Sequence, residues 1–170
     1  MGPRLSIRQE EVSKKLIELL NQALADEWLS YYCFWIGAKV MVGQMRDEIA
    51  KELEEMATEE LKHAGVLADK IIGLGGTPVL TPKDWHKIAN CTYEAPKDFS
   101  VKSILFQNIK SKQRAVDAYK TLISFTKGKT SFNHEILSDI LEEEIEQKDY
   151  LINMVEHLEE KTSNGVKKEI

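Results

Sequence analysis

A carboxylate and an imidazole stand where a helix should present apolar side chains. Between Arg46 and Leu74 the apolar residues follow a helical repeat, and Glu60 and His63 occupy two steps of its inward stripe. Burying such groups without partners costs several kcal/mol, of order 2–7 for an uncharged polar group. Both types bind divalent metal ions, and a spacing of three places them on one helix face. The pair therefore predicts half of a metal site.

Further polar residues lie on the inward stripes of other predicted helices. Glu27 interrupts the apolar stripe of the first long helix, and Glu144 interrupts that of the last. Lys112 takes an inward position on the helix between them, which contains no glutamate. The predicted metal ligands are Glu27, Glu60, His63 and Glu144.

The elements that must position these residues are four long helices. Short connections join the first pair and the second pair, whereas a long segment with three of the four prolines separates the pairs. This pattern predicts an all-α four-helix bundle with one long crossover, the ferritin-like arrangement. We expect the helices at 8–42, 46–74, 100–127 and 131–160, a short helix at 82–91, a bundle domain at 8–160, and flexible tails at 1–7 and 161–170.

The two halves of the bundle repeat in sequence. Glu27 precedes Glu60 by 33 residues, and Lys112 precedes Glu144 by 32. Lys112 is therefore the counterpart of Glu27, and Gln147 is the counterpart of His63. A two-ion carboxylate site in such a bundle uses a Glu from each of two helices and a Glu-x-x-His from each of the others. The first half is complete here, but the second keeps only one ligand.

The charge of this altered set suits one divalent ion. Three glutamates and one lysine leave a charge of minus two, which one such ion cancels. Protons on His63 and on one carboxyl group with a raised pKa cancel it equally well. Lys112 would then replace a metal by pairing with glutamates, and Gln147 would form a hydrogen bond or ligate weakly.

Composition narrows the class of protein. The chain has 170 residues and a net charge of −5, which disfavours nucleic-acid binding. No apolar run reaches the ~20 residues of a membrane span, and no signal-peptide core precedes the first helix. Two cysteines make no disulfide framework, so we expect a reducing, cytoplasmic location.

Several neighbouring residues have plainer expected roles. Asp26 should point into solvent, Cys33 should pack in the core, and Cys91 should be inert rather than redox-active. The acidic run 142–146 should form a solvated face, except for Glu144. Tyr31 and Tyr119 lie on inward stripes, and their hydroxyls should be able to donate to the carboxylates.

The chain resembles the Dps-like proteins called thioferritins, which are relatives of bacterioferritin. The resemblance covers nearly the whole chain and is carried by five segments: Ala25–Tyr32, Glu59–Ala64, Leu74–Pro78, the region of Cys91, and Ile140–Glu146. It implies a hollow dodecameric cage. A di-iron centre would oxidise ferrous iron, and the cage would store the oxide inside. By this resemblance the ligand roles pass to Glu27, Glu60, His63 and Glu144.

Three family features are altered. The family reads Glu-Gln-Cys where this chain has Lys112, Gln113 and Arg114, so a ligand and the cysteine partner of Cys91 are both missing. The last motif ends in Gln147 rather than His. The methionine that binds haem in bacterioferritin is replaced by Leu61, so we expect no haem.

Two functions follow from these observations. In the first, the chain is an iron-binding and iron-storage cage subunit that protects against oxidative stress. It would hold at most one iron per site, with ferroxidase activity weakened or lost. In the second, it is a non-catalytic shell subunit in which a Lys112–glutamate network replaces the di-iron centre. Assembly with an active paralogue is compatible with either function.

Overall fold

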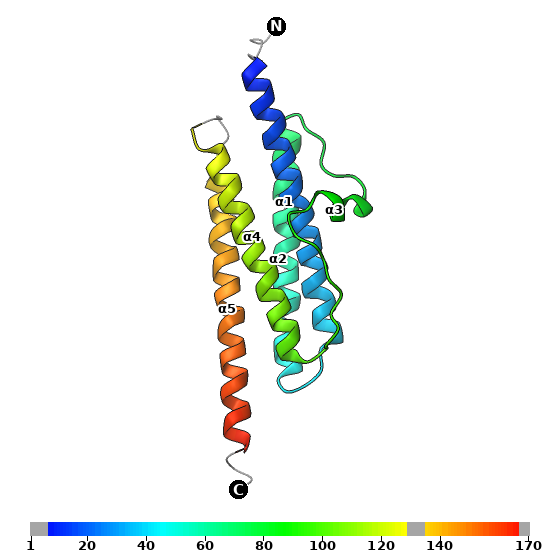
Figure 1. The fold of residues 1–170 in the computed structure, drawn as a ribbon, viewed down its shortest axis with the longest axis vertical. Coiled ribbons are helices and arrows are strands. Elements are labelled where there is room, and N and C mark those ends of the chain that lie inside the picture. The colour runs from blue at the N-terminus through cyan, green and yellow to red at the C-terminus, as the bar shows by residue number, and fades with distance from the viewer. Residues whose placement is uncertain (1–6, 129–134, 167–170) are drawn as a thin grey trace.

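The structure, a computed structural model, describes residues 7–128 and 135–166. Within them the chain forms four long helices and one short one (Figure 1). None of these helices is long and apolar enough to span a membrane. The helices are α1 (Ile7–Val40), α2 (Arg46–Gly73), α3 (Pro82–Ile88), α4 (Val101–Thr126) and α5 (Glu135–Val166). The predicted all-α bundle with a long crossover is confirmed.

Local chemistry explains where the helices start and stop. Ser100 caps α4, and its side chain accepts a hydrogen bond from the backbone N–H of Ser103 at 3.3 Å. Beyond α2, Gly75 adopts a left-handed φ of 77°, and the N–H of Gly76 donates to the carbonyl of Ile71 at 2.9 Å. This closes the last turn in the way that glycine permits.

The last helix is longer than its sequence predicts. The predicted end at residue 160 is wrong, since α5 continues to Val166 and extends past the other helices (Figure 1). No proline interrupts its backbone hydrogen bonds, so polar composition alone does not end it. Of the predicted tails, residues 1–6 and 167–170 lie outside the described residues, as do 129–134 before α5.

A close approach joins the two helix pairs. A Cβ atom on Gly37 of α1 would lie 2.9 Å from Ile104 of α4, which is too close for an ordinary contact. Glycine therefore lets these two helices meet. At the same end of the bundle, Val42 accepts a hydrogen bond from the N–H of Val101 at 3.1 Å and donates one to Phe99 at 2.8 Å.

The crossover is fastened to α1 by buried contacts. Asp26 is buried, and its carboxylate accepts hydrogen bonds from Asn90 Nδ2 at 2.7 Å and from the N–H of Cys91 at 3.0 Å. The prediction that Asp26 points into solvent is therefore wrong. Beside it, the rings of Trp28 and Trp85 stack with centroids 5.2 Å apart, which holds α3 against α1.

A polar layer divides the apolar core of the bundle. One cluster of buried apolar residues surrounds Phe34, Leu53 and Leu105, near the connection of α1 to α2. The other surrounds Leu20 and Leu67, towards the start of α1. A set of buried polar side chains from all four long helices lies between these clusters. They include Glu27, Glu60, His63, Lys112 and Glu144.

Candidate metal centre

Four potential ligands from three helices meet in the middle of the bundle. Glu27 comes from α1, Glu60 and His63 from α2, and Glu144 from α5. One donor atom of each lies within 4.8 Å of the others, and all four side chains are buried. The structure thus brings together every residue that the sequence predicted for the site.

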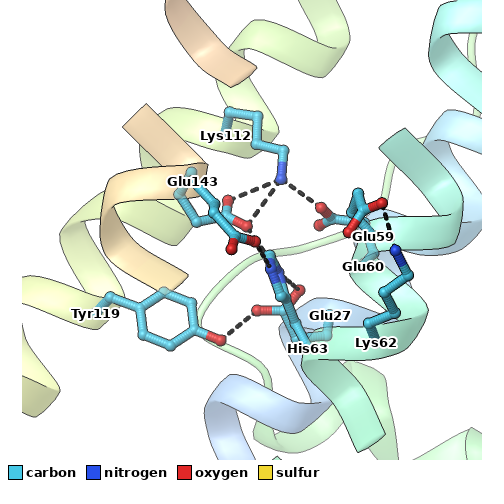
Figure 2. Close-up of polar contacts among 9 residues, drawn as sticks. Glu27, Glu59, Glu60, Lys62, His63, Lys112, Tyr119 and Glu143 are labelled. Carbon is cyan, nitrogen blue, oxygen red and sulfur yellow. Dashed lines mark hydrogen bonds and ion pairs between the residues drawn. The ribbon is translucent and has the colours of Figure 1, made fainter. Parts of the chain in front are cut away.

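Lys112 of α4 reaches the same centre. Its ammonium group donates to both oxygens of Glu144, at 2.8 and 2.9 Å, and makes a short hydrogen bond to Glu60 Oε1 (Figure 2). Its nitrogen lies 5.3 Å from the centroid of the Phe34 ring, a cation–π contact. The side chain is fully buried, so the predicted inward orientation of Lys112 is confirmed.

His63 is held between carboxylates on both sides of its ring. Nδ1 lies 3.2 Å from Glu144 Oε1 and 3.6 Å from Glu27 Oε2, distances that allow ion pairing without an aligned hydrogen bond. Nε2 lies 2.7 Å from Glu143 Oε2 across the α2–α5 seam (Figure 2). Nδ1 therefore faces the buried centre, and Nε2 faces the half-exposed Glu143.

Tyr119 completes the polar layer from α4. Its hydroxyl donates a short hydrogen bond to Glu27 Oε1, as the sequence predicted. Burial and the Glu27 carboxylate raise the pKa of Tyr119 well above its usual range, so it stays a donor. It leaves the second oxygen of Glu27 to face the centre.

The protonation states follow from burial and neighbouring charges. Burial raises the pKa of Glu60 well above its usual value, Glu144 adds to the effect, and Lys112 opposes it. Burial alone would also raise the pKa of Glu144, but the contacts with Lys112 and His63 lower it. These shifts favour the proton on Glu60 and the negative charge on Glu144.

The two bases remain protonated for the converse reason. Burial disfavours the imidazolium of His63, but the carboxylates of Glu144, Glu27 and Glu143 outweigh burial and raise its pKa to about 11. The pKa of Lys112 likewise stays above its usual range, since Glu60 and Glu144 outweigh its desolvation. Protons can therefore balance the charges of this centre.

Unsatisfied atoms test whether the centre fits a metal ion. Glu27 Oε2, Glu60 Oε2 and His63 Nδ1 are buried and make no hydrogen bond among the described residues. Buried polar atoms without partners are rare in native proteins. Here they belong to three of the four residues that cluster, and they are ligand types that iron accepts. The residues present fit a divalent metal ion.

Two residues behave differently from the sequence prediction. Gln147 makes no hydrogen bond to the centre among the described residues. Its Oε1 is buried without a hydrogen-bond partner among the described residues, and the side chain lines a surface pocket with Glu59 and Glu146. Glu143, expected on a solvated face, instead contacts His63. Helical periodicity does not identify this contact, because Glu143 lies on the flank of α5 and its partner depends on the neighbouring helix.

The two cysteines are unpaired and lie beside the crossover. Cys33 is buried, as predicted, and shares a cavity of about 300 Å³ with the half-buried Cys91. Burial raises the pKa of the Cys33 thiol to about 12, and burial together with Asp26 raises that of Cys91 further. These shifts favour the neutral thiols, and the inertness of Cys91 stays a prediction.

The chain belongs to the ferritin-like domain family, whose pattern matches residues 17–161. It is 41% identical to a dodecameric thioferritin, the bacterioferritin-related protein of Bacteroides fragilis, with a TM-score of 0.86 over 89% of this chain and 90% of that one. It is 28% identical to the DNA protection during starvation protein of Pyrococcus furiosus, over 78% of this chain and 72% of the relative. Bacterioferritin of Desulfovibrio desulfuricans has the same fold, with a TM-score of 0.74 and 22% identity over 92% and 86% of the two chains.

Proposed function

We propose that this chain is an iron-binding and iron-storage subunit of a dodecameric, cytoplasmic cage that protects against oxidative stress. The observation that supports iron binding most directly is the buried cluster of four ligand residues, three of which carry an atom without a hydrogen-bond partner among the described residues. The thioferritin relative is described as dodecameric, and the Pyrococcus relative as a protein of DNA protection during starvation. The acidic net charge of −5 argues against direct DNA binding, so protection would act through iron.

We further propose that each centre holds one ferrous ion through Glu27, Glu60, His63 and Glu144. An ion of charge +2 would take the place of the proton on Glu60 and the proton on His63 Nδ1, leaving the charge unchanged. Lys112 stays between Glu60 and Glu144 and supplies the positive charge that a second ion would bring. A bound ferrous ion supplies one electron to an oxidant, so a centre with one ion should oxidise iron slowly.

The second candidate function is a shell subunit without metal. Lys112 makes three hydrogen bonds to Glu60 and Glu144, and His63 pairs with three carboxylates. This network balances charge with protons alone. Such a subunit would form part of the cage wall, and an active paralogue in the same cage would oxidise the iron.

Anaerobic titration of the purified protein with ferrous iron separates the two functions. We expect close to one iron per subunit by elemental analysis, and slow oxidation above the buffer rate when peroxide or oxygen is added. Glu60→Gln should lose the ion, whereas Glu55→Gln at an exposed position of α2 should keep it. No bound iron and no oxidation above buffer would exclude the iron-binding function and leave the shell subunit.

A further inference from the structure

Two thioethers and an imidazole line one pocket beside the connection between α1 and α2. Met45 comes from that connection, whereas Met154 and His157 come from α5, and the pocket has a volume of about 200 Å³. None of the four candidate iron ligands lines it. Met154 lies ten residues beyond Glu144, which is about 15 Å along the helix. The pocket is therefore distinct from the buried centre.

The spacing on α5 places a sulfur and a ring nitrogen on one helix face. Met154 and His157 are three residues apart, and side chains at this spacing are neighbours on a helix. The side chain of His157 is 54% exposed, and its Nδ1 lies 4.0 Å from Glu160 Oε2, which is longer than a hydrogen bond. A contact of this length does not fix the ring, so a nitrogen of His157 can face the pocket that it lines.

Met45 reaches the same pocket from a backbone conformation that its residue type does not favour. Its φ is 61° and its ψ is 13°, in the left-handed region that suits glycine or asparagine. It is also the N-cap of α2, where Ser, Thr, Asp or Asn would accept a hydrogen bond, and its side chain makes none. Two local preferences are thus broken at one residue. Such departures cluster at functional sites, where another role of the side chain outweighs them.

The ligand types and the local charge suit a soft monovalent cation. Thioether sulfur selects copper(I), whereas carboxylates suit harder divalent ions. Two thioethers and a neutral imidazole leave the positive charge of such an ion uncompensated. Glu48 and Glu52 line the same pocket. Burial, a hydrogen bond to Glu52 and the charge of Glu48 all raise the pKa of Tyr150, which also lines it, so carboxylate charge is felt there.

We propose that Met45, Met154 and His157 form a binding site for copper(I), separate from the proposed iron centre. Two thioether sulfurs and one imidazole nitrogen hold the ion, and no redox step is part of the proposal. Both methionines also pack against the apolar cluster around Phe34. Packing alone is therefore the competing explanation for them, and the experiment must distinguish a sulfur that binds from a side chain that only fills space.

The test uses silver(I) as the probe, because it is as soft as copper(I) and keeps one oxidation state. The full chain carries ¹³C at its methionine methyl groups, and Met→Leu variants assign the NMR signals. Since Cys33 and Cys91 are free thiols that compete for silver, the titration continues past two equivalents. We expect the signals of Met45 and Met154 to shift together. Met56, one turn before Glu60, reports silver at the centre instead and should not shift. Unshifted signals of Met45 and Met154 would overturn the proposal.

Three variants separate binding from packing. Met154→Leu conserves side-chain volume but removes the sulfur, and His157→Asn removes the imidazole. Each should reduce or abolish the silver-induced shift of Met45. His86→Asn, at an exposed position of α3, should leave that shift as in the parent. A Met45 shift that persists unchanged in both Met154→Leu and His157→Asn would show that the residues do not share an ion. Because these side chains lie outside the iron centre, failure to bind iron would not affect this result.

Discussion

Lys112 shows how a buried ammonium group can supply part of the positive charge that a metal ion would otherwise provide. Its ammonium is fully buried, contacts two carboxyl groups and lies over the face of Phe34. Removing a lysine from water is costly, and only close opposite charges with good hydrogen bonds compensate for it. Both conditions hold here. Removing either partner should therefore be more damaging than at any surface ion pair.

We expect Lys112→Met to destabilise the metal-free protein by about 3–5 kcal/mol at neutral pH, because the buried Glu144 carboxylate would lose its ammonium partner and Glu60 would lose its hydrogen-bond donor. Denaturant unfolding measures the loss. Lys62→Met is the matched control, since Lys62 is 62% exposed and pairs with Glu59 at 2.7 Å. That variant should change stability by about 0–1 kcal/mol. Equal effects of the two substitutions would contradict the bridging role of Lys112.

Metal affinity should rise with pH. His63, with a pKa of about 11, and Glu60, with its raised pKa, both hold protons at neutral pH in the metal-free protein. A cation must displace these protons, so acid competes with binding and base favours it. Each displaced proton changes the affinity about tenfold per pH unit. Calorimetry of Co²⁺ binding in buffers of different ionisation enthalpy should show release of about two protons; release of none would contradict these protonation states.

The inward residues could be predicted from periodicity because a buried polar side chain interrupts an apolar stripe. Glu27, Glu60, His63, Lys112 and Glu144 were all found in this way. Glu143 was missed because it interrupts nothing. Its role depends on which helix lies beside its flank, and that follows from packing rather than from the sequence of α5.

At the scale of elements, the crossover is a ligand-positioning device as well as a connection. Asp26 holds Asn90 and Cys91, and the next residue of α1 is Glu27. Trp28, which follows, stacks on Trp85 of α3. Of these three consecutive residues of α1, the first and the third thus hold the crossover, and the second belongs to the metal centre.

We expect Asp26→Ala to loosen the crossover, because two of its donors, on Asn90 and Cys91, would lose their buried acceptor. The cost should be about 1–3 kcal/mol. Hydrogen exchange of residues 79–98 should accelerate, while exchange in the middle of α2 should not. Asp117→Ala is the control, since Asp117 is exposed and accepts only a surface hydrogen bond from Gln113 at 3.1 Å. Unchanged exchange in the crossover would show that other contacts hold it.

Helix number, order and most boundaries could be predicted from the sequence, because caps and glycines mark them. The end of α5 could not, since the helix continues through a polar segment in which no proline marks a boundary. The burial of Asp26 could not either. On an isolated helix it lies beside the inward stripe, and only the crossover covers it.

At the scale of the whole molecule, the bundle is two similar helix pairs around one centre. The first pair contributes Glu27, Glu60 and His63, whereas the second contributes Lys112 and Glu144 and leaves Gln147 aside. The asymmetry of the centre thus arises from two substitutions at equivalent positions, in a fold that otherwise keeps both halves.

Lys112→Glu combined with Gln147→His should convert the centre from one ion to two. Four carboxylates and two imidazoles then surround it, and the charge matches two divalent ions. Metal stoichiometry measures the change, and each single variant serves as a control. We also expect faster ferrous oxidation in the double variant. An unchanged stoichiometry would show that the two halves are not in the register proposed here.

The division of the core into two apolar clusters bears on why selection has retained the polar layer between them. Buried ionic layers can often be replaced by well-packed apolar residues with no loss of stability, or with a gain of about 1–4 kcal/mol. A continuous core joining the clusters around Leu53 and Leu67 would thus fold at least as well. Selection for folding alone gives no reason to keep five charged or titratable side chains at the midpoint of this bundle. Their presence indicates that this polar layer is retained for function rather than for stability.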